Sequence, residues 1–436
     1  MIFAIGAILG GLALCAAAFP RAGSRAEQLF RFAAGALLGL GISGALSMAL
    51  RLAGLPAPWK DRALVVAGAA VLVAVRGRGL RLEAGVVRAC SDRILAAADA
   101  AAALLVFALF VEHTVRYPDG GWDARAIWNL HARALHRAPL RLDLAFSPEM
   151  PEAHPDYPLL VPALVADAFG VAGEDSYASG SIALAFAALL VAVVGTSAAA
   201  SLGPAAGCAA ALLVLGFPAL LQLGATQCAD VPLAALLATA CALAVHARGG
   251  RGSLLLAGLA ASLCALTKNE GLDWAAALWI AVSTAMRGRA ALAMLLGGLP
   301  GFVLLLVFKL RFAPPNAFAA HTTVAGLWAR VSDFHRFAAV ASGLVAQSWN
   351  FASWGLAGPA VVVAAAWPLR LSSGSFEAAR ILRRALALCT ASVFAIYLAA
   401  PPDVAALLPV SADRLLFQLS GAAVLLATTS WFAPRR

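Results

Sequence analysis

Long apolar runs recur along most of the chain, and short polar or basic segments separate them. Ten runs approach or reach the roughly 20 residues that a membrane-spanning helix needs: 2–19, 32–50, 94–111, 180–200, 205–222, 231–247, 290–310, 352–369, 385–400 and 415–431. Three shorter runs, at 63–75, 253–267 and 271–286, need flanking residues in order to cross a bilayer. The pattern predicts an all-α polytopic membrane protein with about 13 transmembrane helices.

The composition agrees with this pattern. Of the 436 residues, 62% are hydrophobic and only 12% are charged, whereas a soluble domain carries about 25% charged residues. The net charge of +10 does not indicate a nucleic-acid partner, because in a membrane protein the side on which the charges lie is what matters. The first run lacks the basic leader of a signal peptide, so we expect it to remain as an anchor.

The distribution of charge predicts an orientation. With 112–179 placed outside the cell membrane and the sides alternating from there, the inner loops hold 18 of the 32 Lys and Arg residues, and 17 of the 22 acidic residues lie outside. Cytoplasmic loops carry the excess of basic residues. We therefore expect the N-terminus outside and the C-terminus inside.

This topology requires that the apolar stretch 159–173 does not cross the bilayer. It is short and contains Asp167, so we interpret it as an interfacial helix. The chain then divides into an N-terminal transmembrane extension, 1–93, and a main transmembrane domain, 94–436, whose outer segments are 112–179 and 311–351.

The first outer segment contains the most unusual stretch, PDGGWDARAIWNLHARALHR, residues 118–137. Its PDGG start predicts a turn. A helix is expected from Ala124, lying on the membrane surface, with Trp122 and Trp128 at the interface and a polar face of Arg125, Asn129, Arg133 and Arg137. Asp123 precedes this helix, where it is either an N-cap alone or, since the two roles are compatible, also a base that takes a proton from a hydroxyl group.

Further polar groups stand at the predicted outer ends of apolar runs. EAHPDYP places His154, Asp156 and Tyr157 before the interfacial helix, where a Pro-braced turn is the alternative to a functional site. Asp230 stands before Pro232 at a helix start, a common capping arrangement. Each of these groups has an ordinary structural explanation when it is taken alone.

Two cationic groups are harder to explain by local structure. Lys268 and Glu270 interrupt two apolar runs in LTKNEG, and Lys is scarce here, with only Lys60, Lys268 and Lys309 beside 29 Arg. A local Lys/Glu pair in a turn is the alternative. Arg414, at the outer start of the last run, is either a snorkelling side chain or a phosphate ligand.

Cysteine and histidine patterns predict no resident metal or disulfide. Of seven cysteines, only Cys228 is expected on the outer side, and no CxxC pair is present. Six of the seven histidines are expected outside, but no HExxH or other tight ligand spacing occurs. We expect no cofactor, with a divalent cation as the alternative.

The order of GWDARAIWNLHARAL, HPDYPLLVPAL, ADVPLA, LTKNEG and DRLLFQL resembles that in integral-membrane glycosyltransferases of the GT-C fold. It resembles especially that in bacterial members related to protein O-mannosyltransferases and lipid A aminoarabinose transferase. The resemblance covers roughly 94–436, and it implies a GT-C-like catalytic domain in the bacterial cytoplasmic membrane with its active site on the outer side.

Carried over to this sequence, the resemblance implies roles for four residues. Asp123 would be the catalytic base and Asp230 the second acidic position, while Lys268 and Arg414 would lie near the donor phosphate. Because GWDAR holds a single acid, the base is either Asp123 or a partner such as Asp156. The pocket would also include Trp122, Arg125, Trp128, Asn129, His154, Tyr157 and Glu270.

The resemblance further implies the reaction and its partners. A sugar would pass from a polyprenyl-phosphate donor to a hydroxyl group of a glycan, lipid or protein, with inversion at the anomeric carbon and no nucleotide-sugar site. The main alternative function is a transporter or lipid flippase, which predicts ionisable groups near the middle of spans and broken helices. A lipid-linked polymer ligase or polymerase is a second alternative.

Overall fold

The computed structural model describes residues 2–18, 24–55, 90–139, 141–147, 149, 151–247, 250–286, 288–316, 322–366, 373–400 and 403–434. The predicted span at 63–75 lies outside these residues, as does Lys60.

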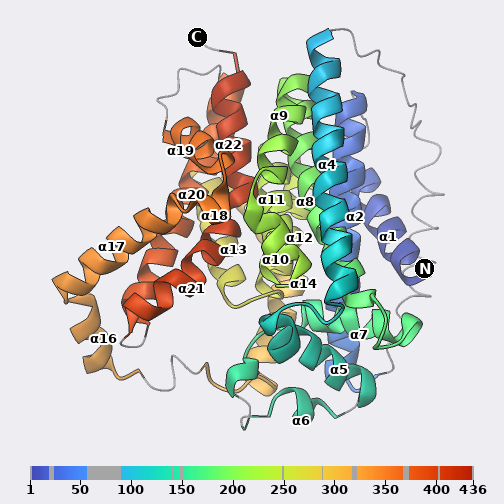
Figure 1. Ribbon diagram of the computed structural model, residues 1–436, viewed down its shortest axis with the longest axis vertical. Helices are drawn as coiled ribbons and strands as arrows, with labels where there is room; N and C mark the ends of the chain where they lie inside the picture. The colour runs from blue at the N-terminus through green and yellow to red at the C-terminus, as the bar shows by residue number, and fades with distance from the viewer. Residues whose placement is uncertain are drawn as a thin grey trace.

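Every regular element of the described chain is a helix (Figure 1). The elements are α1 (Ile2–Ala18), α2 (Arg25–Leu52), α4 (Cys90–Arg116), a π-helical turn (Ala124–Trp128), α5 (Asn129–Arg137), α6 (Leu142–Ala145), a 3-10 turn (Pro151–Ala153), α7 (Leu160–Ala172), α8 (Ala178–Leu202), α9 (Pro204–Leu215), α10 (Pro218–Ala225), α11 (Asp230–Val245), α12 (Arg251–Ala265), α13 (Glu270–Ala285), α14 (Gly288–Arg311), α16 (Val324–Val331), α17 (Phe334–Ser348), α18 (Phe351–Trp354), α19 (Ala357–Ala366), α20 (Ser373–Ala399), α21 (Val404–Phe417) and α22 (Ser420–Phe432).

Five described helices are long and apolar enough to cross a membrane: α2, α4, α8, α14 and α20. The count rises to seven if each of two bent pairs is one span. The pairs are α9 with α10, bent by 58°, and α21 with α22, bent by 55°. Several of the other predicted spans form helices of 10–17 residues, including α11, α12 and α19. The apolar helices indicate a membrane protein, with five to seven candidate spans in the described chain.

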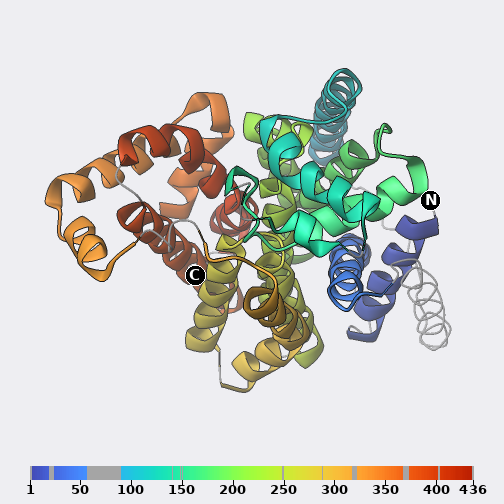
Figure 2. The same ribbon diagram turned by 90° about the horizontal axis from the view of Figure 1, so that it is seen from below.

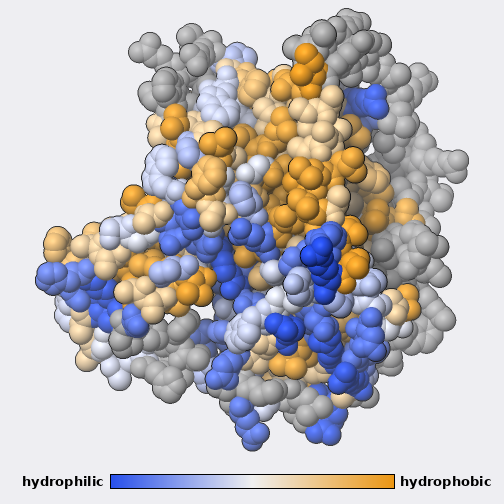
Figure 3. Space-filling model, viewed as in Figure 1, coloured by the Kyte–Doolittle hydropathy of each residue, from blue (hydrophilic) through white to orange (hydrophobic). Residues whose placement is uncertain are grey.

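The long helices run side by side, and α11 lies at their centre (Figure 1). Every residue of α11 from Asp230 to Ala244 is buried, as expected for a helix that is apolar on all sides. By contrast, α4 stands at the edge, where Leu104 is 75% exposed. Hydrophobic side chains cover the body of the molecule beside α4, and hydrophilic ones gather below it (Figure 3). This division is typical of a lipid-facing belt above a water-facing base.

Close backbone contact holds α12 against α14. A Cβ atom on Gly258 would lie 1.8 Å from the Met294 carbonyl oxygen, and one on Gly297 would lie 1.9 Å from that of Leu255. Small residues at helix interfaces allow such an approach, which is a common way of packing helices in membranes. The glycines therefore fix the position of α14, whose last turn carries Lys309.

The first outer segment folds into a base formed by α5, α6 and α7 at the lower ends of the long helices (Figure 1). The predicted interfacial helix is α7, but Leu160 and Leu164 are fully buried because α7 packs against α2 and α5. Arg51 of α2 donates a hydrogen bond to Asp167 of α7 at 2.8 Å and another to the Leu135 carbonyl oxygen of α5 at 2.7 Å. The N-terminal segment therefore holds the base in place.

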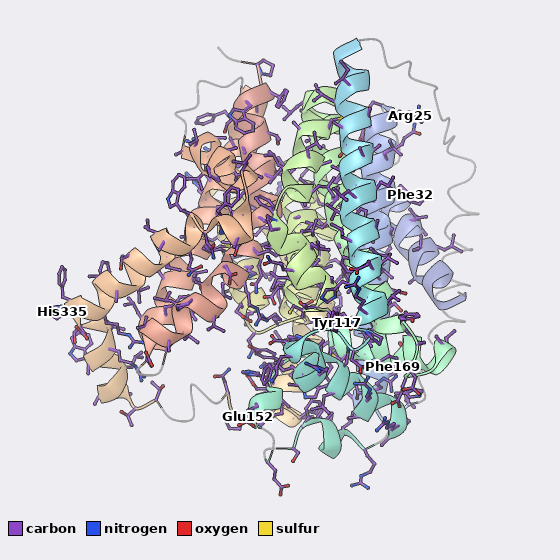
Figure 4. The ribbon with its side chains drawn as sticks, viewed as in Figure 1. Arg25, Phe32, Tyr117, Glu152, Phe169 and His335 are labelled. Carbon is purple, nitrogen blue, oxygen red and sulfur yellow. The ribbon has the colours of Figure 1, made fainter. Side chains whose placement is uncertain are left out.

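The second outer segment forms an arm from α16 and α17. Seen from below, the arm and the base lie on opposite sides of the centre (Figure 2). His335 marks the outer end of the arm, far from Glu152 of the base (Figure 4). The inner part of α17 packs against α20 and α21, so the arm is joined to the helix that carries Arg414.

Candidate active site

Arg414 joins two carboxylates that lie far apart in the sequence. Its Nη2 donates hydrogen bonds to Asp123 Oδ2 at 2.5 Å and to Asp230 Oδ2 at 2.9 Å. Asp123 belongs to the base, Asp230 begins α11, and Arg414 lies in the last turn of α21. Arg414 therefore binds both carboxylates, and the interpretation of Arg414 as a snorkelling side chain is wrong.

Asp230 is fully buried, and both of its carboxylate oxygens are occupied. Oδ1 accepts hydrogen bonds from Lys268 Nζ at 3.0 Å and from Gln418 Nε2 at 2.6 Å, while Oδ2 binds Arg414. A buried carboxylate is tolerated when cations and donors surround it in this way. The arrangement lets Asp230 orient the two cations, but it leaves no oxygen free to accept a substrate proton.

The junction between α12 and α13 brings Lys268 and Glu270 to the same place. Lys268 is 4% exposed, and its Nζ lies 3.3 Å from Glu270 Oε1 as well as 3.0 Å from Asp230. The local Lys/Glu pair therefore forms, but it is part of a larger group. We call Asp123, Asp230, Lys268, Glu270 and Arg414 the charged cluster.

Asp123 presents its carboxylate to this cluster from the base. Its backbone is helical, with φ −59° and ψ −41°, and its side chain makes no capping hydrogen bond. The predicted N-cap is therefore wrong, because the carboxylate binds Arg414 instead. The Asp123 side chain keeps 18% of its surface exposed, against 0% for Asp230. Of these two acids, Asp123 is the one that an incoming molecule reaches.

A hydrogen-bonded clamp fixes the loop before Asp123. Asn129 donates to Gln227 Oε1 at 2.7 Å, Gln227 donates to the Pro118 carbonyl at 2.9 Å, and Gly121 N–H donates to the Thr226 carbonyl at 3.0 Å. Gln227 has φ +61°, a conformation that costs free energy for a residue other than glycine. The structure thus holds the loop 118–121 rigidly against the segment that leads into α11.

Asp156 lies in a second polar group beside the first. Its Oδ2 accepts hydrogen bonds from Asn269 at 2.6 Å and from Asn316 at 2.7 Å, and its main-chain oxygen accepts one from Lys309. Lys309 also donates to Asn269 Oδ1 at 2.7 Å. Since Asn269 follows Lys268 directly, the two groups are neighbours. Asp156 is only 3% exposed, against 18% for the Asp123 side chain, so it is the less accessible of the two predicted bases.

A stack of aromatic rings packs beside the two groups. Tyr157 stacks between Trp128, with ring centroids 5.5 Å apart, and His154, with centroids 4.7 Å apart. Lys268 Nζ lies 5.9 Å from the centre of the Tyr157 ring. Burial raises the pKa of Tyr157 above its usual value. The rings of the HPDYP segment therefore form a stack with Trp128, and the Tyr157 ring packs within the base.

The two tryptophans of the opening stretch take different positions. Trp122 is 61% exposed, as expected for an interfacial residue, but Trp128 is 1% exposed. The prediction of an interfacial Trp128 is wrong, because its ring packs on Tyr157 within the base. Arg125 is exposed. The helix after Asp123 therefore packs into the protein.

An apolar groove lies between α12, α13 and α14, and it reaches the second polar group. Its volume is about 460 Å³, and Lys309 lines it together with apolar side chains that include Ala261, Leu272, Trp279, Phe302 and Leu306. Leu272 and Leu306 are 46% and 56% exposed, so the groove is open at the surface of the protein. Its lysine end lies next to the α12–α13 junction that supplies Lys268.

Sequence reasoning missed several residues that complete the site. Gln418 accepts a hydrogen bond from Trp274 at 2.8 Å while it donates to Asp230. Its signal was an amide inside an otherwise apolar run, one turn after Arg414. The scarcity of Lys was the signal for Lys309. Nothing in the local sequence marked Gln227 or Arg51, because only tertiary contacts give them partners.

No group of three or more His, Cys, Asp or Glu side chains in the described part of the chain is placed to hold a metal ion. Comparisons with known proteins add no further information: no family model matches the chain, and neither a curated protein nor a solved structure does.

Proposed function

We propose that this protein is a membrane glycosyltransferase. It would move a sugar from a polyprenyl-phosphate donor to an acceptor hydroxyl group, on the outer face of a bacterial cytoplasmic membrane. The observation that carries the proposal is the contact of Arg414 with both Asp123 and Asp230. This contact helps to bring together, in the charged cluster, the four residues to which the resemblance to GT-C enzymes assigns roles.

The chemistry assigns a different task to each side of the cluster. The acceptor oxygen attacks the anomeric carbon while Asp123 takes its proton, so a new C–O bond forms. The bond between the anomeric carbon and the phosphate oxygen breaks, and the polyprenyl phosphate leaves with the electron pair. Arg414 stabilises the charge on that phosphate, and the buried Lys268 adds positive potential beside it.

Asp230 serves as a positioning residue in this scheme. Its two occupied oxygens hold Lys268 and Arg414 in place before the donor binds, so no free energy is spent on arranging them during the reaction. Asp123 is left as the more accessible acid. This division of tasks follows from burial, because a carboxylate that is 0% exposed and fully hydrogen bonded does not reach an acceptor hydroxyl.

The apolar groove supports a lipid-linked donor. Its wall of leucine, phenylalanine and tryptophan side chains suits an isoprenoid chain, and Lys309 at its polar end suits the phosphate region. Lys309, at this end of the groove, donates a hydrogen bond to Asn269, which follows Lys268 in the sequence. A chain in the groove would therefore bring its phosphate toward the charged cluster.

The test is sugar transfer by the purified full chain in lipid nanodiscs. Supplied with radiolabelled polyprenyl-phosphate sugars and a membrane glycolipid extract as acceptor, the protein should release polyprenyl phosphate and label the acceptor. Asp123→Asn should slow transfer by about 100-fold or more, since a general base contributes about 10²- to 10⁴-fold. Asp175→Asn, which changes an exposed acid of the same outer segment, is the matched control. Transfer that survives Asp123→Asn at the control rate would refute the proposal.

One observation favours transport as the second candidate. The pairs α9–α10 and α21–α22 are bent by 58° and 55°, and broken helices surround the binding sites of many transporters. Arg414 lies one turn before the second break. A flippase would move the intact sugar lipid between leaflets without breaking the phosphate bond. Translocation of an uncleaved fluorescent sugar lipid in proteoliposomes, unaffected by Asp123→Asn, would support this alternative.

A further inference from the structure

A polar surface beside Arg414 takes no part in the scheme above. It is formed by the C-terminal end of α17, the short helix α18, α10 and α21, and we call its side chains Gln222, Asn350, Ser353 and Asp413 the polar wall. Gln222 is exposed, whereas Asn350 and Asp413 are half-buried. Hydrophilic side chains gather where α17, α18 and α21 meet (Figure 3). Such a concentration is unusual at the level of apolar helices.

The polar wall is built into the active site at one end. Ser353 Oγ donates to Asp413 Oδ2 at 2.9 Å, and the Arg414 backbone N–H donates to Asp413 Oδ1 at 2.8 Å. The next side chain along α21 is therefore the guanidinium that binds Asp123. Asp413 is therefore the sequence neighbour of the residue that binds the proposed base.

The other end of the wall is tied to the loop that carries Asp123. Gln222 Nε2 donates to the Ala352 carbonyl at 3.2 Å, and Thr226 Oγ1 donates to the Gln222 carbonyl at 2.6 Å. Thr226 in turn accepts the Gly121 N–H. Trp122, the next residue, is 61% exposed. Trp122 is thus an exposed aromatic residue directly after the backbone contact that ties this loop to α10, and the wall itself offers hydroxyl, amide and carboxylate groups.

The charge of this region selects the kind of molecule that fits it. Asp413 makes no salt bridge among the described residues. Together with the charged cluster, it brings four carboxylates beside two cations, and the donor phosphate adds further negative charge. The carboxylates and the donor phosphate would repel an acceptor that carries an anionic group of its own. Amides and carboxylates, however, bind neutral hydroxyl groups as acceptors and donors, and an aromatic ring covers the apolar face of a sugar.

We propose that the polar wall is the acceptor site and that the acceptor is an uncharged, hydroxyl-rich glycan. The inference rests on the proposed function and adds to it the substrate class. Asp413 and Gln222 bind hydroxyl groups of the acceptor, Trp122 stacks against one of its rings, and Asp123 receives the proton of the hydroxyl group that reacts.

The test is binding of oligosaccharides to the full chain in nanodiscs, by saturation-transfer NMR. The probes are neutral tri- to pentasaccharides of hexoses and pentoses, each compared with a counterpart that contains a uronic acid. At least one neutral probe should bind, and its uronic-acid counterpart should bind at least tenfold more weakly. Asp413→Asn and Gln222→Ala should each weaken binding about tenfold. Ser342→Ala, which alters an exposed hydroxyl of α17 bonded within its own helix, should leave binding unchanged.

The outcomes separate this inference from the proposed function. Equal binding of charged and neutral probes, binding that neither variant changes, or no binding of any neutral probe would overturn the acceptor site. Because Asp413→Asn preserves the shape of the side chain, it tests the wall even if Gln222→Ala disturbs the contact between α10 and α18. Sugar transfer that depends on Asp123 but not on Asp413 would leave the glycosyltransferase intact and remove only the acceptor assignment.

Discussion

Arg414 and Asp123 form an ion pair across 291 positions of the sequence, with Nη2 and Oδ2 2.5 Å apart. The pair connects the base to α21, and therefore the first outer segment to the last quarter of the chain. Because Arg414 also holds Asp230, a single guanidinium fixes the positions of three polypeptide segments.

Removing the buried acid should destabilise the whole fold. Asp230→Ala leaves Lys268 and Arg414 without their shared counter-charge in an environment where Asp230 is 0% exposed. Loss of one partner of a buried ion pair costs about 3 to 5 kcal/mol. The free energy of unfolding, measured by denaturant titration in mixed micelles, should fall by that amount. Asp175→Ala, at an exposed position, should change it by less than about 0.5 kcal/mol. Equal stability of the two variants would contradict this account.

The ion pair between Arg51 and Asp167 should hold the base to the N-terminal segment. Both side chains are nearly inaccessible, at 5% and 7%, so Arg51→Met alone leaves a buried carboxylate and should be strongly destabilising. The double variant Arg51→Met with Asp167→Leu should recover part of the loss, because it leaves neither charge unpaired. A double-mutant cycle on unfolding free energies measures this coupling. Strictly additive effects would show that the pair does not act as a unit.

His131 should make the base sensitive to acid. Burial, together with the nearby His154, lowers the pKa of His131 to about 4, although Asp156 opposes this shift. The unfolded chain, with a pKa of about 6.5, therefore binds the proton first. The contribution of His131 to stability is fully present above about pH 6.5 and is lost as the pH falls toward 4, by about 3 kcal/mol in total.

The comparison that isolates this effect is with His131→Leu. Thermal unfolding midpoints of both proteins, measured between pH 7.5 and 4.5, should show a larger decrease for the wild-type chain. Other acidic groups titrate in the same range, but they are common to both proteins. Parallel pH profiles would mean that His131 is not the group responsible.

Filling the apolar groove should weaken donor binding without affecting the chemistry. Ala276 lines the groove between α12, α13 and α14, and Ala276→Trp occupies the space that an isoprenoid chain would take. The KM for a long-chain polyprenyl-phosphate sugar should rise about tenfold or more, with kcat little changed, as expected when ground-state and transition-state binding are lost equally. Val363→Trp, at an exposed position of α19, is the control. A normal KM in Ala276→Trp would exclude the groove as the chain site.

The sequence by itself determined the helical, membrane-type character of the chain. Apolar runs and the near absence of charge within them require backbone hydrogen bonds to close inside each segment, and helices satisfy this requirement locally. The same reasoning identified Asp123, Asp230, Lys268 and Arg414, because charged groups at the ends of apolar runs stand out against their surroundings. It did not fix the number of spans, since short helices such as α11 and α12 and the bends after α9 and α21 depend on how neighbouring helices pack.

Only the tertiary structure decided what each charged residue does. Local sequence gave Asp123 and Asp230 the same interpretation as helix caps, and their different burial became visible when Arg414, Lys268 and Gln418 came from other helices to meet them. Trp122 and Trp128 likewise share one motif but lie on the surface and in the interior. The physical reason is that periodicity and capping act over a few residues, whereas desolvation and ion pairing depend on groups brought together from nearly 300 positions away.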